Sequence, residues 1–122
     1  MADAVRVDLA EKFASFDKHW SPKLVETLDG YEIKLVKIMG DFVWHKHDDL
    51  DEMFLVIKGS FRMKFRDRDV DLAAGQMIVV PKGVEHCPTA AEECEIMLFE
   101  RAGVVNTGDA APNRLTNPIE RI

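Results

Sequence analysis

Three of the chain's four histidines fall at positions 45, 47 and 86, and two of them, His45 and His47, are separated by one residue. Side chains alternate between the faces of a β-strand, so a strand over residues 42 to 47 would point both imidazoles the same way. Neutral imidazole binds zinc, iron, nickel, copper or manganese, and a carboxylate commonly completes such a set. Glu52 follows closely enough to supply it. The spacing therefore predicts a metal site.

A second cluster of turn-forming residues ends at His86. Gly75 precedes the apolar run at 76–80, and Pro81 and Gly83 follow that run. Glycine and proline at these positions reverse the chain at each end of a short strand. His86 therefore directly follows a predicted turn, as a ligand held on a loop would.

Together the two clusters resemble the two signature motifs of the cupin family. The first motif places a glycine shortly before an HxH pair, then a glutamate and a second glycine. The second places a glycine, a PxG turn, a histidine and an asparagine in order. The first glycine here, Gly40, stands one residue closer to the HxH pair than in the family pattern, and Ala90 occupies the asparagine position. The resemblance covers roughly residues 24 to 100, and it implies four metal ligands: His45, His47, Glu52 and His86.

The strand pattern favours the same fold as the resemblance. Short apolar or alternating segments follow one another without an intervening helix, which is typical of an antiparallel sandwich or barrel. The predicted strands are 23–28 and 31–39, joined at Asp29-Gly30, then 42–47, 52–58, 60–67, 69–73, 76–80 and 94–100. The resemblance implies an all-β cupin double-stranded β-helix, a small antiparallel β-barrel or jelly roll, with the four ligands inward at one end of a cavity.

The length of 122 residues predicts one domain with its own core. Leu9, Phe13 and Phe16 recur at helical spacing and predict a short N-terminal helix within residues 7–19. We therefore divide the single cupin domain 1–122 into an N-terminal helical segment (1–22), a barrel (23–100) and a C-terminal tail (101–122). Two alternatives stay open for the tail, which is either mobile or docked through its final aliphatic residues.

The net charge limits the possible partners, and the N-terminus and the cysteines indicate the compartment. A formal net charge of −6 and a pI near 5.2 argue against a nucleic-acid or anionic membrane partner, because both require a basic surface. The first residues lack the apolar run of a signal peptide, and no stretch has the length of a membrane span. We therefore expect a cytoplasmic protein, in which Cys87 and Cys94 are reduced.

The predicted strand at 52–58 is apolar on both faces. Glu52 and its alternate neighbours share one face, and Met53, Leu55 and Ile57 share the other. Such a strand must be covered twice, so either the N-terminal helix or a second subunit lies over the outward face. Small cupins similar to this chain commonly dimerise through the sheet, and we expect a homodimer.

Three neutral imidazoles, one carboxylate and a divalent ion sum to a charge near +1, which favours an anionic oxygen ligand. We expect one divalent metal ion per chain (Fe, Mn, Zn, Ni or Co) and a small anionic molecule in the barrel. The favoured function is a small metal-dependent enzyme acting on a sugar-derived or keto-acid substrate, of isomerase, lyase or dioxygenase type. The alternative is a non-catalytic, metal-dependent small-molecule binding or sensor protein, because fold alone transfers no activity.

The functions of several other residues are not decided by the sequence. Asp51 is the rival of Glu52 as the fourth ligand, and we prefer Glu52 because its spacing to Gly59 matches the motif. The catalytic residues are unknown, and Tyr31, Lys82 and Arg101 are candidates by chemistry alone. His19 lies outside both motifs and is expected at the surface.

Overall fold

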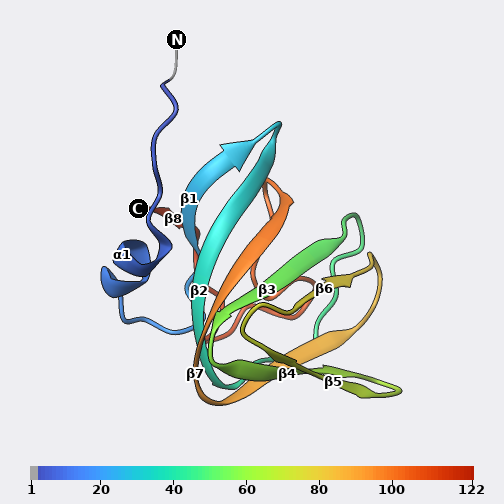
Figure 1. Ribbon diagram of the computed structural model, residues 1–122. Coiled ribbons are helices and arrows are strands. Elements are labelled where there is room, and N and C mark those ends of the chain that lie inside the picture. Colours follow the sequence, from blue (N-terminus) through green and yellow to red (C-terminus); the bar gives the residue numbers. More distant parts are fainter. Residues whose placement is uncertain (1–2) are drawn as a thin grey trace.

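The computed structural model describes residues 3–122 and contains one short helix and eight strands (Figure 1). The helix α1 comprises Leu9–Ala14. The strands are β1 (Lys23–Leu28), β2 (Tyr31–Asp41), β3 (Glu52–Lys58), β4 (Ser60–Phe65), β5 (Asp69–Ala73), β6 (Met77–Val80), β7 (His86–Arg101) and β8 (Glu120–Arg121). No helix in this part of the chain is long and apolar enough to cross a membrane.

The longest strand, β7, pairs with three other strands. It pairs with β2 along most of its length, with β4 near its start and with β3 towards its end. β1 extends the sheet beyond β2, while β5 and β6 lie beyond β4 and β3. These pairings are antiparallel, and β8 adds a short parallel pairing to β1. The result is the predicted all-β antiparallel architecture with a short N-terminal helix (Figure 1).

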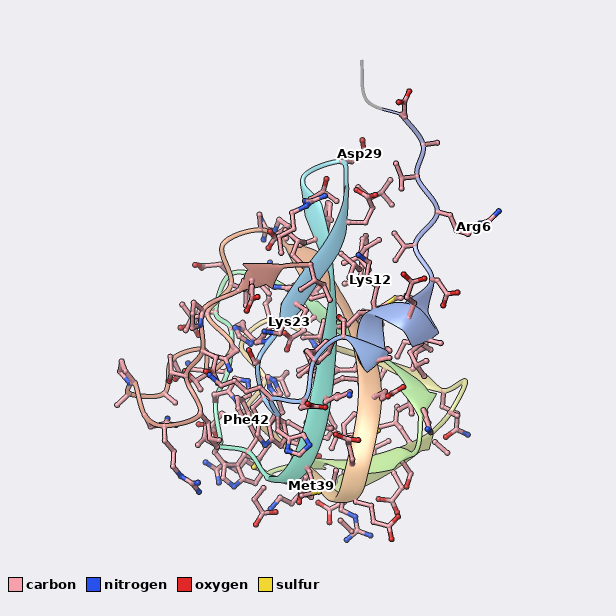
Figure 2. The ribbon with its side chains drawn as sticks, turned by 90° about the vertical axis from the view of Figure 1, so that its left-hand side faces the viewer. Arg6, Lys12, Lys23, Asp29, Met39 and Phe42 are labelled. Atoms are coloured by element: carbon pink, nitrogen blue, oxygen red, sulfur yellow. The ribbon has the colours of Figure 1, made fainter. Side chains whose placement is uncertain are left out.

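The hairpin predicted at Asp29-Gly30 is confirmed. The two residues have φ angles of 50° and 79°, and Leu28 pairs with Tyr31 across the turn. Positive φ at both central positions is the type I′ geometry that an Asp-Gly pair favours in a tight hairpin. Asp29 lies at the tip of this hairpin, and Met39 lies near the opposite end of β2 (Figure 2).

The core lies inside the barrel formed by the eight-stranded sheet and follows the period-two pattern of the strands. Along β3 the inward residues Glu52, Phe54 and Val56 are buried, while the residues between them are half-buried. Along β4 the inward residues are Phe61, Met63 and Phe65. Both predicted alternations are confirmed, and burial of these side chains is the main force that holds the barrel together.

The predicted helix is shorter than expected. Asp8 caps its first turn, since the side chain accepts a hydrogen bond from the N–H of Glu11, and the helix ends at Ala14 rather than near residue 19. The hydroxyl group of Ser15 donates to the carbonyl of Lys12, and this local bond competes with further helical turns. The helix lies outside the β1–β2 pair (Figure 2). Its buried Phe13 packs in a second apolar cluster with Val25 and Leu35.

Two predicted strands differ from the observed ones. Residues 42–47 form an extended segment with one isolated bridge, between His45 and His86, because the carbonyls of Lys46 and His47 accept hydrogen bonds from Asp109 and Gly83, which lie in loops. The strand predicted at 94–100 begins eight residues earlier, at His86. The first part of β7 has weak strand propensity, but the β4 and β2 ladders supply its hydrogen bonds.

The outward face of β3 is covered only at one end. Met53, Leu55 and Ile57 are all half-buried. Of these three, Ile57 packs against the cluster beneath α1. On the adjacent β6, Met77 and Val79 are 53% and 48% exposed. The helix therefore covers one end of this apolar face and leaves the β3–β6 part open to solvent.

The C-terminal residues 102–119, which we call the C-terminal strap, dock on the barrel. The amide of Asn106 donates to the carbonyls of Trp20 and Leu115, at 3.0 and 2.8 Å. Thr107 is completely buried, and Leu115 packs against the main core. Of the two alternatives for the tail, the docked one describes the structure.

Candidate metal centre

The two motif segments lie side by side because their main chains hydrogen-bond to each other. The N–H of His45 donates to the carbonyl of His86 over 3.0 Å, and the reverse bond measures 2.9 Å. Glu52 begins β3, whose next residues pair with both β6 and β7. This pairing brings residues that are distant in sequence to one end of the barrel.

All four predicted ligands meet there. One potential ligand atom from each of His45, His47, Glu52 and His86 lies within 4.8 Å of every other. The Oε1 atom of Glu52 is 3.4 Å from Nε2 of His47 and 3.6 Å from Nε2 of His86. His45, Glu52 and His86 are buried.

Hydrogen bonds on the far side of two rings orient them towards the centre of this cluster. Nδ1 of His45 lies 2.9 Å from the carbonyl oxygen of Val43, and Nδ1 of His86 lies 2.9 Å from that of Val84. A carbonyl accepts only from a protonated nitrogen, so each Nε2 keeps its lone pair, as is usual for metal-ligating histidines.

The cluster also contains polar atoms that lack a protein partner. Among the described residues, the buried Nε2 atoms of His47 and His86 have no hydrogen-bond partner. Buried polar groups are normally satisfied, so two such atoms facing a carboxylate call for another ligand. Three imidazole nitrogens and one carboxylate oxygen are a donor set for a divalent transition metal. The cluster therefore suggests a metal site.

The protonation states favour the metal-binding forms. Burial, helped by the neighbouring His86, lowers the pKa of His45 from 6.5 to about 4. Burial acts to raise the pKa of Glu52, but the adjacent side chains of Glu100, His47 and His86 outweigh it and hold that pKa well below its usual range. A neutral imidazole and an ionised carboxylate can both bind a cation.

A small cavity adjoins the cluster inside the barrel. The cavity has a volume of about 40 Å³, and His45 and Glu52 form part of its wall. Most of the remaining wall is apolar, including Val36, Ile38, Phe54, Leu98 and Val104. A ligand bound beside the metal site would therefore be small and largely shielded from water.

The C-terminal strap closes this end of the barrel. The N–H of Lys46, between the two HxH histidines, donates to Oδ1 of Asp109 over 2.8 Å, and the N–H of Asp109 donates back to the Lys46 carbonyl over 3.1 Å. Val104 and Asn106 line the cavity. The strap thus fixes the main chain of the HxH segment and covers the cavity.

The other sequence candidates lie outside the cluster. Asp51 accepts a hydrogen bond from the N–H of Lys82, and His19 pairs with Glu93 at 2.8 Å at the surface. Tyr31 stacks on Phe99, and the Arg101 guanidinium donates to the carbonyl of Asp49. None of the three candidate bases, Tyr31, Lys82 and Arg101, lines the cavity.

Sequence reasoning missed two charged residues in the cavity wall, Lys34 and Glu100. Lys34 alternates with Val36 and Ile38 on β2, and Glu100 alternates with Ile96 and Leu98 on β7. A charged residue in phase with inward apolar residues was the available signal. It was ambiguous because the other face of β2 is also apolar around Leu35.

The fold and the histidine–glutamate cluster define a class of small barrel proteins, and the chain belongs to the cupin family: the cupin domain model matches residues 34–100. A cupin-2 domain containing protein of Shewanella frigidimarina has a similar structure, with a TM-score of 0.77 and 48% identity, over 78% of this chain and 93% of that one. Protein NMB1881 of Neisseria meningitidis has a TM-score of 0.74 and 29% identity, over 80% and 100%. The uncharacterized protein YdbB of Bacillus subtilis is 29% identical over 84 residues, 68% of either chain.

Proposed function

We propose that the protein is a small metal-dependent enzyme that acts on an anionic keto-acid or sugar-derived substrate in the barrel. The observation that carries the proposal is the cluster of His45, His47, Glu52 and His86, which adjoins a cavity that His45 and Glu52 line. Four protein ligands leave further positions open on an octahedral ion, and a catalytic metal needs such positions for its substrate.

The charge of the site supports an anionic substrate. Three neutral imidazoles and one carboxylate leave a divalent ion with a net charge near +1, so a carboxylate or enolate oxygen is a favourable further ligand. When bound, the metal would polarise a carbonyl group as a Lewis acid or, as iron, bind dioxygen. Isomerase, lyase and dioxygenase chemistry are all compatible with this site.

The cavity wall favours a short substrate over an intact sugar. Hydroxyl groups that lie against Val36, Ile38 and Leu98 find no hydrogen-bond partner on those side chains. Each unpaired buried hydroxyl costs about 1–3 kcal/mol. A keto acid of a few carbon atoms, with its oxygens gathered near the metal, avoids most of this cost.

A second function, non-catalytic binding of a small anion, is favoured by one observation. The C-terminal strap covers the cavity, with Thr107 completely buried and Asp109 bonded to the HxH segment. A closed site suits slow release of a ligand as well as it suits chemistry. Turnover distinguishes the two functions, because a binding protein would return the ligand unchanged.

The experiment is to remove metal with a chelator, reload the protein with Fe²⁺, Mn²⁺, Zn²⁺, Ni²⁺ or Co²⁺ separately, and measure bound metal and turnover on a panel of short keto acids. We expect about one ion per chain and turnover with at least one metal. His47→Ala should lose bound metal, whereas His19→Ala, outside the cluster, should keep it. Protein that binds no metal after reloading would refute the proposal, and metal binding with ligand retention but no turnover would favour the binding function.

A further inference from the structure

An amine and a carboxyl side chain lie together inside the barrel, beside the candidate metal centre, and burial raises the pKa of the carboxyl group, that of Glu100, to about 9. Nζ of Lys34 on β2 is 2.7 Å from Oε1 of Glu100 on β7. The residues are 1% and 2% exposed. Both line the cavity that His45 and Glu52 also line.

Stability does not account for this pair. Burying an amine and a carboxyl group removes both from water, and replacing such a pair with apolar residues of similar volume is often neutral or stabilising. Val36, Ile38, Ile96 and Leu98 occupy the neighbouring inward positions, so apolar residues suit this part of the barrel. An amine–carboxyl pair at the wall of this cavity is therefore better explained by what it binds.

The hydrogen-bonding capacity of the pair is not used up by the protein. Lys34 has three N–H donors, and its second carboxylate neighbour, Glu32, is 3.8 Å away, beyond hydrogen-bond distance. Among the described residues, the buried Oε2 of Glu100 and Oε1 of Glu32 have no hydrogen-bond partner. The pair thus offers a donor and an acceptor side by side at one end of an otherwise apolar cavity.

A hydroxyl group is the ligand group that matches this arrangement. It accepts one hydrogen bond, here from the Lys34 ammonium, and donates one, here to a carboxyl oxygen of Glu100. Glu100 and Glu52 lie at neighbouring inward positions, since Met53 pairs with Phe99 in the β3–β7 ladder, so the hydroxyl would lie close to the metal-bound part of the ligand. The hydroxyl would then be carried by the carbon atom next to the keto carbon.

We propose that Lys34 and Glu100 form a hydroxyl-binding subsite that selects small 2-oxo acids carrying a hydroxyl group next to their metal-chelating oxygens. The proposal rests on the proposed function, because the metal holds the carboxylate and keto oxygens while the Lys34–Glu100 subsite binds the hydroxyl group. A ligand without the hydroxyl group leaves both polar groups without that partner, and the resulting penalty provides the selectivity.

The test compares hydroxypyruvate with pyruvate, which present the same chelating oxygens to the metal and differ by one hydroxyl group. Their dissociation constants are measured by calorimetry on protein loaded with Mn²⁺. We expect the wild type to bind hydroxypyruvate at least about tenfold more tightly, as one hydrogen-bonded hydroxyl can provide. The double variant Lys34→Met/Glu100→Leu should bind both probes with similar affinity and retain its bound metal.

Two further variants serve as controls. Lys37→Met removes another buried lysine of β2, one that faces outward and donates to the carbonyl of Phe16, and it should keep the preference for hydroxypyruvate. Glu100→Gln retains the shape of the side chain and should reduce the preference severalfold, which tests the subsite even if the double variant does not fold.

The outcomes separate the subsite from the proposed function. A wild type that binds Mn²⁺ and pyruvate but shows no preference for hydroxypyruvate overturns the subsite alone. A folded double variant that keeps the preference also overturns it, because the pair would then be structural. Protein that binds neither Mn²⁺ nor pyruvate contradicts the proposed function itself.

Discussion

Asp51 and Lys82 join the two loops that carry the candidate ligands: the main-chain N–H of Lys82 donates to Oδ1 of Asp51 over 2.9 Å. The neighbouring residue, Glu52, turns the opposite way and is buried beside His47 and His86. Two adjacent carboxylates therefore have different tasks. One holds the loop that leads to His86, and the other lies in the cluster.

This difference predicts that substitutions of Glu52 and Asp51 have unequal effects on metal affinity. Glu52→Gln should weaken metal affinity by at least about tenfold, because loss of a direct ligand costs at least as much as loss of its supporting contacts. Asp51→Asn should change metal affinity little, since its amide oxygen can still accept from Lys82. Competition with a metal-binding dye measures both affinities. The reverse ranking would make Asp51 the ligand and shift the register of β3 by one residue.

The residues of the candidate metal site could be predicted because their types and spacing are specific. His45, His47, Glu52 and His86 were predicted together, and the structure brings them together. The inward alternation of β3 was also predictable, because few arrangements bury Phe54 and Val56 on the same face as Glu52. Local pattern was sufficient for these features.

Features that depend on tertiary contacts could not be predicted in this way. The first part of β7 contains Pro88 and Ala90, which are weak strand formers, and its pairing comes from β4 and the end of β2. The inward position of Lys34 could not be predicted, because the sequence does not show which face of β2 is inward. Docking of the C-terminal strap depends on Asn106 and Thr107, whose partners lie in other segments or in the strap itself.

Burial of Cys94 predicts a loss of stability in alkaline solution. Burial raises its pKa from 9.0 to about 11, so between these pH values the unfolded state loses a proton that the folded state keeps. The free energy of unfolding should therefore fall as pH rises from 9 to 11. Denaturant unfolding across this range measures the slope, and Cys94→Ala should make it shallower. An unchanged slope would show that another group causes the dependence.

The uncovered apolar face of β3 and β6 predicts a homodimer. Leu55 pairs with Met77 across the two strands, and a second copy of the chain would bury both. Leu55→Glu should give monomer or insoluble protein, because dimerisation would bury an unpaired carboxylate. Leu28→Glu is the matched control, since Leu28 is an exposed leucine at the hairpin tip, away from this face. Light scattering that finds a monomeric wild type at tens of micromolar would refute the dimer.

The contact between the C-terminal strap and the HxH segment gives the last prediction. Gly108 has φ +56°, and a Cβ atom there would lie 2.9 Å from Cδ2 of His45 and closer still to the carbonyl oxygen of Lys46. Neither neighbour can move without disturbing the ring of a candidate ligand, so Gly108→Ala should displace the strap and weaken both stability and metal affinity.

Gly103→Ala separates backbone strain from this contact. Gly103 also has positive φ, at +88°, but a Cβ atom there meets nothing within 4 Å. It should cost only the strain of an alanine in that conformation, about 1–2 kcal/mol, and leave metal affinity unchanged. Thermal unfolding and dye competition compare the two variants. If Gly108→Ala matched Gly103→Ala in metal affinity, the strap would cover the cavity without holding His45 in place.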